Sequence, residues 1–379
     1  VQLTDTQTLT NKTLTSPTID GTMSLKEQAS ANVDATEHGQ LWVKTGNPNE
    51  LYFTNEDGDN IQLTSGSSMA NAGISDITNS LLYSNHDIYI NSNNSWSQLG
   101  NDIDGENSGD QSGVSVSINR DGTIVAIGAL KNGGNGAESG HVRVYQRDAD
   151  AAIGWSQLGP DIDGEASGDR SGVSVSLSSD GTIVAIGAYL NDGENASNSG
   201  HVRVYKYDGA TWNQLGGDID GENSGDLSGL WVSLSADGTI VAIGAYRNDD
   251  GPGTDSGHVR VYKYDSTNTN APVGWSQLGS DIDGEVSGDK SGLSVSLSAD
   301  GTILAIGAPH HESDKGTTRI YRYNGSYWTK LGSDIDGEDG SDESGCSVSL
   351  SADGRTVVIA AEKHDNQKGH VRVYNFAEE

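Results

Sequence analysis

The chain has 379 residues, a formal net charge of −32, 51 glycines and a single cysteine. The acidic balance excludes a nucleic-acid-binding role, because phosphate groups are bound mainly by Lys and Arg side chains. One cysteine excludes an intramolecular disulfide framework, and no apolar run reaches the roughly eighteen residues of a membrane-spanning helix.

Residues 1–36 are polar and rich in threonine. The stretch TLTNKTLTSP, residues 8–17, contains too few leucines to fold by itself. It resembles the low-complexity N-terminal segments of bacteriophage tail fibres and related virion fibre proteins. That resemblance implies an extended segment for virion anchoring and oligomerisation; a disordered tail is the alternative.

Residues 37–64 are predicted to form a small β-meander with strands at Gln40–Lys44, Glu50–Thr54 and Asn60–Thr64. The pattern is similar to a small module of phage structural proteins. Three strands this short are marginally stable alone, so we expect this region to assemble the protein into a homotrimer. Residues 65–94 are interpreted as a linker.

From residue 95 to residue 379 a unit of about sixty residues repeats five times. Each repeat is marked by a tryptophan that opens a Trp-x-(Gln or Lys)-Leu-Gly run: Trp96, Trp155, Trp212, Trp275 and Trp328. The second repeat has strand-like runs at Val173–Leu177, Ile183–Ala188, His201–Tyr207 and Trp212–Leu215. Asp-Gly pairs between the first two runs favour tight hairpins. Four-stranded antiparallel sheets of this kind cover one another when repeated radially, which predicts an all-β fold with a β-propeller.

The ends of the repeated region predict how the propeller closes. The last repeat stops at Tyr374 without a Trp-x-x-Leu-Gly strand, whereas Trp96–Leu99 supplies a spare strand of that type. We therefore expect five blades, with residues 95–100 completing the fifth. The run Asp87–Ile90, which resembles the VRVY strand, is surplus in this interpretation.

The sequence GVSVSLSSDGTIVAIGA followed by GHVRVY, within residues 172–205, resembles the FG-GAP repeats of integrin-type propellers. The family's Phe-Gly is replaced by Ser-Gly in every repeat, and only Pro309 preserves the proline of the Val-Gly-Ala-Pro run. The family's calcium loop lies in the first hairpin and needs several acidic residues. Here that hairpin has one aspartate per repeat: Asp121, Asp180, Asp237, Asp300 and Asp353.

Up-and-down strands place the inter-blade loops, with sequence DIDGExSGD, on the same face as the loops that follow IVAIGA. Asp-x-Asp-Gly-Glu offers oxygen ligands at a spacing that suits calcium. The candidate ligands are Asp102, Asp104, Glu106, Asp161, Asp163, Glu165, Asp218, Asp220, Glu222, Asp281, Asp283, Glu285, Asp334, Asp336 and Glu338. The alternative is a turn in which aspartates accept local backbone N–H groups.

The loops after IVAIGA differ between repeats, and variable loops on a rigid scaffold commonly carry recognition. The side chains best suited to stacking on sugars are Tyr189, Tyr246, Arg247, His310 and His311. A histidine recurs once per blade before VRVY, at His141, His201, His258 and His370, and we interpret this set as structural. The arginines of the same strand, Arg143, Arg203, Arg260, Arg319 and Arg372, are predicted to be buried and paired with aspartates.

These features favour a phage structural fibre protein, located in the virion, that displays its propeller for attachment to a host-surface glycan. The expected partners are other virion proteins through the N-terminal part and the glycan itself, with no nucleic acid and no membrane insertion. Calcium is the one cofactor considered. The alternatives are a secreted or cell-surface integrin-like adhesin and a polysaccharide depolymerase. We expect no enzymatic activity, because the paired carboxylates recur in every repeat instead of forming one unique set.

Overall fold

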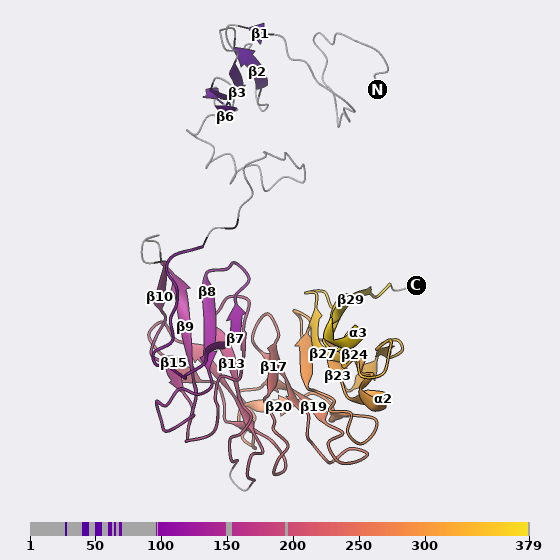
Figure 1. Cartoon of the computed structure of the whole chain (residues 1–379). Coiled ribbons are helices and arrows are strands. Elements are labelled where there is room, and N and C mark those ends of the chain that lie inside the picture. The colour runs from indigo at the N-terminus through magenta and orange to yellow at the C-terminus, as the bar shows by residue number, and fades with distance from the viewer. Residues whose placement is uncertain are drawn as a thin grey trace. The chain divides into compact units, whose positions relative to one another are not determined.

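The computed structural model describes Trp96 and residues 98–148, 154–193 and 196–377, together with short strands between residues 27 and 69. The chain divides into two compact units, Val1–Trp96 and Ser97–Glu379, and each is described by itself (Figure 1). The Thr-rich stretch and the run Asp87–Ile90 lie outside the described residues. No helix in the described part of the chain is long and apolar enough to cross a membrane.

The first unit contains a four-stranded sheet with the order β1-β2-β3-β4. Its strands are β1 (Glu27–Gln28), β2 (Gln40–Lys44), β3 (Glu50–Thr54) and β4 (Asn60–Gln62), and a separate hairpin pairs β5 (Thr64–Ser65) with β6 (Ser68–Met69). The three strands predicted for the meander are present, although the third ends at Gln62. The parallel pairing of β1 with β2 was not predicted.

The second unit is a succession of five antiparallel sheets, one per repeat. The first contains β7 (Ser112–Ile118), β8 (Ile124–Ala129), β9 (His141–Arg147), β10 (Trp155–Gln157) and the short β11 (Ile162–Asp163). The second contains β12 (Ser174–Leu177), β13 (Ile183–Ala188), β14 (His201–Tyr207), β15 (Trp212–Gln214) and β16 (Ile219–Asp220). In each, the fourth strand is interrupted, and its short continuation pairs again with the third strand.

The third sheet contains β17 (Trp231–Leu234), β18 (Ile240–Ala245), β19 (His258–Tyr264), β20 (Trp275–Gln277) and β21 (Ile282–Asp283). The fourth contains β22 (Ser294–Leu297), β23 (Ile303–Ala308), β24 (Thr317–Tyr323), β25 (Trp328–Lys330) and β26 (Ile335–Asp336). The fifth has only β27 (Ser344–Leu350), β28 (Thr356–Ala361) and β29 (His370–Asn375). Single helical turns, α2 (His311–Asp314) and α3 (His364–Gln367), precede β24 and β29.

The core lies between neighbouring sheets. One buried cluster joins Ile183 and Val204 of the second sheet to Val232 and Val241 of the third. The second strands of the second, third and fourth sheets are almost fully buried, and their small residues allow the next sheet to approach closely. At Gly187, a Cβ atom would lie 1.9 Å from the carbonyl oxygen of Gly229 in the following sheet. The apolar IVAIGA runs are thus buried on both faces.

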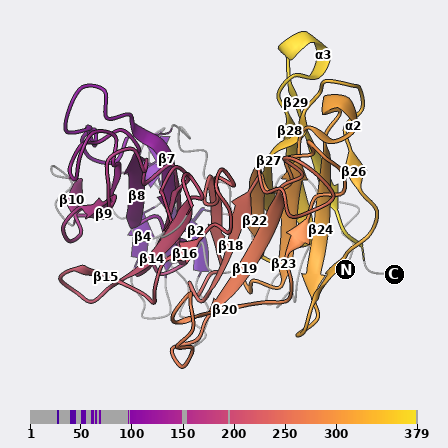
Figure 2. The same ribbon diagram turned by 90° about the horizontal axis from the view of Figure 1, so that it is seen from below.

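The two ends of the succession are uncovered. In the views of Figures 1 and 2 the first and fifth sheets lie at opposite ends. Val116 on β7 is 70% exposed and Val373 on β29 is 64% exposed, whereas the equivalent valines between sheets, Val295 and Val204, are at most 2% exposed. The described residues show five sheets and no closed ring.

Residues 95–100 were predicted to complete the fifth sheet. Among the described residues, that sheet contains only β27, β28 and β29. Leu99 instead contacts the first sheet, where its carbonyl accepts a hydrogen bond from Trp155 Nε1 at 2.9 Å. The same contact joins consecutive sheets elsewhere, from Trp212 to Leu158 at 2.7 Å. Residues near Leu99 therefore occupy the position that a preceding sheet's fourth strand occupies in the other repeats.

Candidate functional site

The two sets of loops predicted to share a face do lie together. Gly168 N donates to the Ala137 carbonyl at 3.0 Å, and Ser171 N donates to the Ser139 carbonyl at 2.9 Å. These bonds tie the inter-sheet loop to the loop that follows β8, and the pattern recurs between later sheets. We call this side of the second unit the loop edge: the DIDGExSGD loops and the loops that follow β8, β13, β18, β23 and β28.

A carboxylate–histidine group recurs on the loop edge of the first three sheets. Each group joins the glutamate of one inter-sheet loop, the first residue of the third strand and the first aspartate of the next loop: Glu106, His141 and Asp161; Glu165, His201 and Asp218; Glu222, His258 and Asp281. Nδ1 of His141 lies 3.9 Å from Glu106 Oε2 and 3.7 Å from Asp161 Oδ2. The carboxylates that meet thus come from two successive loops and not from a single Asp-x-Asp-Gly-Glu run.

The three histidines are 1% exposed, and Nδ1 of each lacks a hydrogen-bond partner. Burial, with the neighbouring Arg203, lowers the pKa of His201 to about 4, and burial with Arg260 does the same for His258. Both imidazoles are therefore neutral near pH 7. The sequence interpretation treated these histidines as isolated structural residues, but each faces acidic side chains from both flanking loops.

The repeated arginines are buried as predicted in four of the five sheets, but their main partner was predicted wrongly. Arg203 Nη2 donates to the main-chain carbonyl of Asp163 at 2.8 Å, and Nη1 lies 3.5 Å from Glu165 Oε1. Arg319 is the exception, with Nε 3.1 Å from Asp334 Oδ2; Arg372, on the uncovered fifth sheet, is only partly buried.

The fourth sheet replaces the histidine with Thr317 and carries a lysine, Lys330, where the first three sheets have Gln157, Gln214 and Gln277. Lys330 Nζ pairs with Asp334 and lies 3.5 Å from Glu285 Oε1. A protein ammonium group thus stands between the two carboxylates that flank a histidine in the other sheets.

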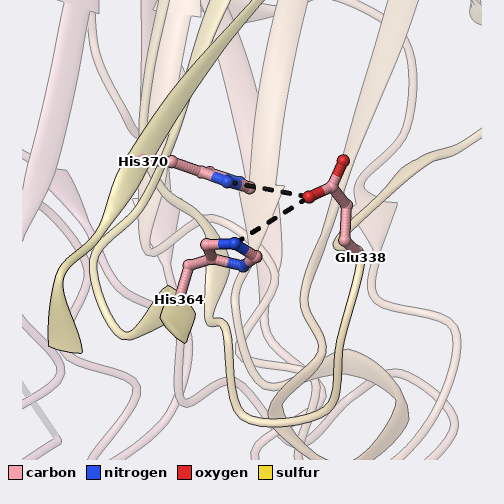
Figure 3. A group of neighbouring side chains, drawn as sticks. All are labelled: Glu338, His364 and His370. Carbon is pink, nitrogen blue, oxygen red and sulfur yellow. Dashed lines mark ion pairs between the residues drawn. The ribbon is translucent and has the colours of Figure 1, made fainter. Parts of the chain in front are cut away.

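The fifth sheet brings two histidines to one glutamate. Figure 3 shows His364 and His370 on one side of Glu338. Glu338 Oε2 lies 4.0 Å from His364 Nε2 and 3.8 Å from His370 Nδ1. The two imidazole rings stack with centroids 3.9 Å apart. On its other side, His364 Nδ1 lies 2.9 Å from Oδ2 of the buried Asp342, and this hydrogen bond raises the pKa of His364.

His364 was missed in the sequence because it lies in a variable loop. Alignment of the repeats would have revealed it. In every repeat, the third residue after the IVAIGA-type strand contacts the last aspartate of the DIDGExSGD loop. Asn191 Nδ2 donates to Asp169 Oδ2 at 3.1 Å. The full set at this position is Asn132, Asn191, Asn248, His311 and His364.

The five recognition candidates all lie on the loop edge. The Arg247 guanidinium lies 5.6 Å from the centre of the Tyr246 ring, with Arg247 exposed and Tyr246 half-buried. Tyr189 accepts a hydrogen bond from Arg170 Nη1 at 2.8 Å. His310 and His311 already pair with Asp314 and Asp289, which leaves them less free to bind a ligand.

The hairpin aspartates at the opposite edge have a local role. Asp180 accepts hydrogen bonds from Ser178 Oγ at 2.6 Å and Thr182 N at 2.9 Å. Burial alone raises the pKa of Asp180, but these hydrogen bonds outweigh it and lower the pKa. The single aspartate of each hairpin therefore stabilises its turn.

Residues 162–205 match the FG-GAP repeat family. The match covers the part of the chain from β11 to β14, and the same order of strands recurs in the neighbouring sheets. No curated protein matches the chain.

Similar solved structures include the Kuenenia stuttgartiensis hydrazine synthase, with 15% identity and a TM-score of 0.44, covering 69% of this chain and 71% of that one. TolB from Acinetobacter baumannii has 14% identity and a TM-score of 0.41, covering 86% of this chain and 57% of that one. A putative 6-phosphogluconolactonase from Bacteroides uniformis has 11% identity and a TM-score of 0.42, covering 87% and 79%.

Proposed function

We propose that this chain is a recognition protein that binds surface glycans through the loop edge. The proposal rests on one observation: the loops of the loop edge have the same backbone hydrogen bonds from sheet to sheet, but their side chains differ. Inter-sheet hydrogen bonds hold the loops in place, while the residues at the start of each variable loop change from Leu130 to Tyr189, Tyr246, Pro309 and Glu362. A rigid frame with variable tips suits specific binding.

Tyr246 and Arg247 form the best contact surface for a sugar. The planar guanidinium lies near the aromatic ring, and together they offer a flat face for C–H groups and donors for sugar hydroxyls. Arg247 also places a positive charge on an otherwise acidic edge, which favours anionic polysaccharides at that point.

We further propose that the chain acts as a phage fibre, with the N-terminal part anchoring it to the virion and joining three copies. The support is the Thr-rich stretch of residues 8–17 and the small sheet β1-β2-β3-β4, whose longest strands have 5 residues and offer little core. Light scattering should then show a trimer for the full chain and a monomer for a chain that begins at Ser65. A trimer from both would place assembly in the repeats, and a monomeric full chain would contradict the fibre.

The proposed ring closes five blades, with residues 95–100 as the fourth strand of the fifth sheet. In support, residues near Leu99 already contact the first sheet as a preceding fourth strand would. In a closed ring, the contact between the fifth and first sheets would differ from the contacts between the other sheets. The fifth repeat has Ala360 and Val358 where the other repeats have the smaller glycine and alanine. We therefore expect a wider spacing between the fifth and first sheets.

The glycan proposal is tested by binding of the full chain to a panel of bacterial envelope polysaccharides. The double variant Tyr246→Ala, Arg247→Ala is expected to lose at least tenfold in affinity for the polysaccharide that the unmodified chain binds. Tyr327→Ala is the matched control, because Tyr327 is an exposed tyrosine in the turn between β24 and β25, at the opposite edge. Unchanged binding by the double variant would exclude this part of the loop edge.

A further inference from the structure

We propose that Glu338, His364 and His370 bind a Zn²⁺ ion on the loop edge of the fifth sheet. The three side chains converge from the inter-sheet loop, the turn α3 and the first residue of β29 (Figure 3). Two imidazole nitrogens and one carboxylate form a ligand set that zinc uses when its fourth position is open to water or another ligand.

The ligand atoms are near the separations that a zinc ion needs. With bonds of about 2 Å in a tetrahedral arrangement, ligand atoms lie about 3.3 Å apart. The carboxylate oxygen is 3.8 Å from His370 Nδ1 and 4.0 Å from His364 Nε2. Binding of one ion by all three atoms requires these separations to shorten and the stacked rings to turn. Both histidines are partly exposed, so the rings have room to turn.

Asp342 fixes the orientation of one ligand. It is 2% exposed, accepts a hydrogen bond from Asp339 N at 2.9 Å, and faces His364 Nδ1. An imidazole that donates from Nδ1 to a carboxylate presents the lone pair of Nε2, and a carboxylate–histidine pair of this kind is the usual outer support of zinc ligands. His364 Nε2 is the atom that faces Glu338.

The fourth sheet places a positively charged side chain at the equivalent location. There Lys330 Nζ stands between Glu285 and Asp334, and the strand begins with Thr317 in place of the histidine. Where this lysine is present, the histidine is absent. Where the lysine is missing, in the first three sheets, a histidine with an unpartnered Nδ1 faces the carboxylates.

Of all these positions, the fifth sheet has the most suitable ligands for zinc. The first three offer one histidine each, whereas the fifth offers two. Arg372 Nη1 lies 3.9 Å from Glu338 Oε1, the other carboxylate oxygen, so Oε2 remains directed at the two histidines.

The test is a titration of the full chain with Zn²⁺ in competition with a chromophoric chelator. His364→Asn removes the ligand nitrogen but keeps a donor for Asp342, as Asn191 does for Asp169. This variant is expected to bind one zinc equivalent at least 100-fold more weakly, because loss of an outer partner alone typically costs about 10- to 100-fold. His311→Asn, the same change at the equivalent position of the fourth sheet, is expected to bind zinc like the unmodified chain.

Ions bound at the first three sheets would appear equally in all variants, so the difference between chains reports the fifth sheet alone. A second variant, His370→Thr, copies the natural Thr317 and is expected to show the same loss. Equal melting temperatures in EDTA establish that the variants are folded. Zinc binding that is unchanged in both His364→Asn and His370→Thr overturns the proposal, as does a bound ion whose X-ray absorption spectrum shows no histidine ligand.

Discussion

At the scale of single residues, the arginine of the third strand ties its strand to the preceding inter-sheet loop. Arg203 is buried, donates to the Asp163 carbonyl and lies over the Tyr205 ring. Replacing it with leucine leaves that carbonyl without its partner, which typically costs about 1–3 kcal/mol. We expect Arg203→Leu to lower the free energy of unfolding by this amount in urea. An unchanged midpoint would mean that the arginine contributes nothing to stability.

The buried histidines make stability depend on pH. The pKa of His201 falls from 6.5 to about 4 on folding, because burial and Arg203 disfavour its charged form. Below pH 6.5 the unfolded chain therefore takes up a proton that the folded chain does not, and stability falls as the pH decreases toward 4. Glu165 and Asp218 face the imidazole. Burial raises the pKa of Glu165, so the folded chain binds a proton there more readily than the unfolded chain, and at lower pH this carboxyl group contributes an increase in stability as the pH falls.

The measurement is urea unfolding in EDTA at pH 7.5 and pH 5.5. His201→Thr, which copies the fourth sheet, is expected to lose less stability over this interval than the unmodified chain. Identical losses in both chains would show that folding does not lower the pKa of His201.

The sequence predicted many residues of the loop edge, but it did not predict which of them contact one another. The acidic and histidine positions were visible as repeats in the sequence. The order of the strands in the sheet brings Glu165, His201 and Asp218 together. Their spacing in the sequence does not indicate this contact. The arginine partner was misjudged for the same reason, since Arg203 donates to the main-chain carbonyl of Asp163, a group that the repeated aspartates do not reveal.

At the scale of elements, one glycine in each of the first four sheets controls how closely the next sheet packs. A Cβ atom on Gly187 would lie 1.9 Å from the Gly229 carbonyl oxygen, which is main chain and cannot move alone. Gly187→Ala is expected to destabilise the chain by about 1–3 kcal/mol, as other overpacked core substitutions do. Gly340→Ala is the control, since no atom lies within 4 Å of the added Cβ. Equal urea midpoints for the two variants would contradict this role.

The strands themselves were largely predictable. Alternation and Asp-Gly turns located β12, β13, β14 and β15 to within one residue at either end. The split of the fourth strand was not predicted, because the Leu-Gly pair after β15 breaks the ladder and β16 pairs again with β14 only in three dimensions. The positive φ of Gly216, 79°, permits this break.

At the scale of the whole molecule, Trp96 tests whether the ring closes. In the other sheets the indole donates to the leucine carbonyl of the preceding fourth strand, so closure would direct Trp96 Nε1 to Leu331. Trp96→Ala would then destabilise the chain as strongly as Trp212→Ala, by about 3–5 kcal/mol. In an open succession of sheets Trp96 is fully exposed, and its replacement would leave the urea midpoint unchanged.

The net charge of −32 makes binding of an anionic polysaccharide unfavourable unless a cation intervenes. Carboxylates from two loops meet on the loop edge, and a calcium ion there can bridge protein and sugar oxygens. We therefore expect adsorption to an anionic polysaccharide to be lost in EDTA and restored by added Ca²⁺. Zn²⁺ in place of Ca²⁺ should not restore it, and His364→Asn should behave like the unmodified chain, which separates this bridge from the zinc ion of the fifth sheet. Adsorption that persists in EDTA would mean that Arg247 and its neighbours overcome the repulsion without a bridging ion.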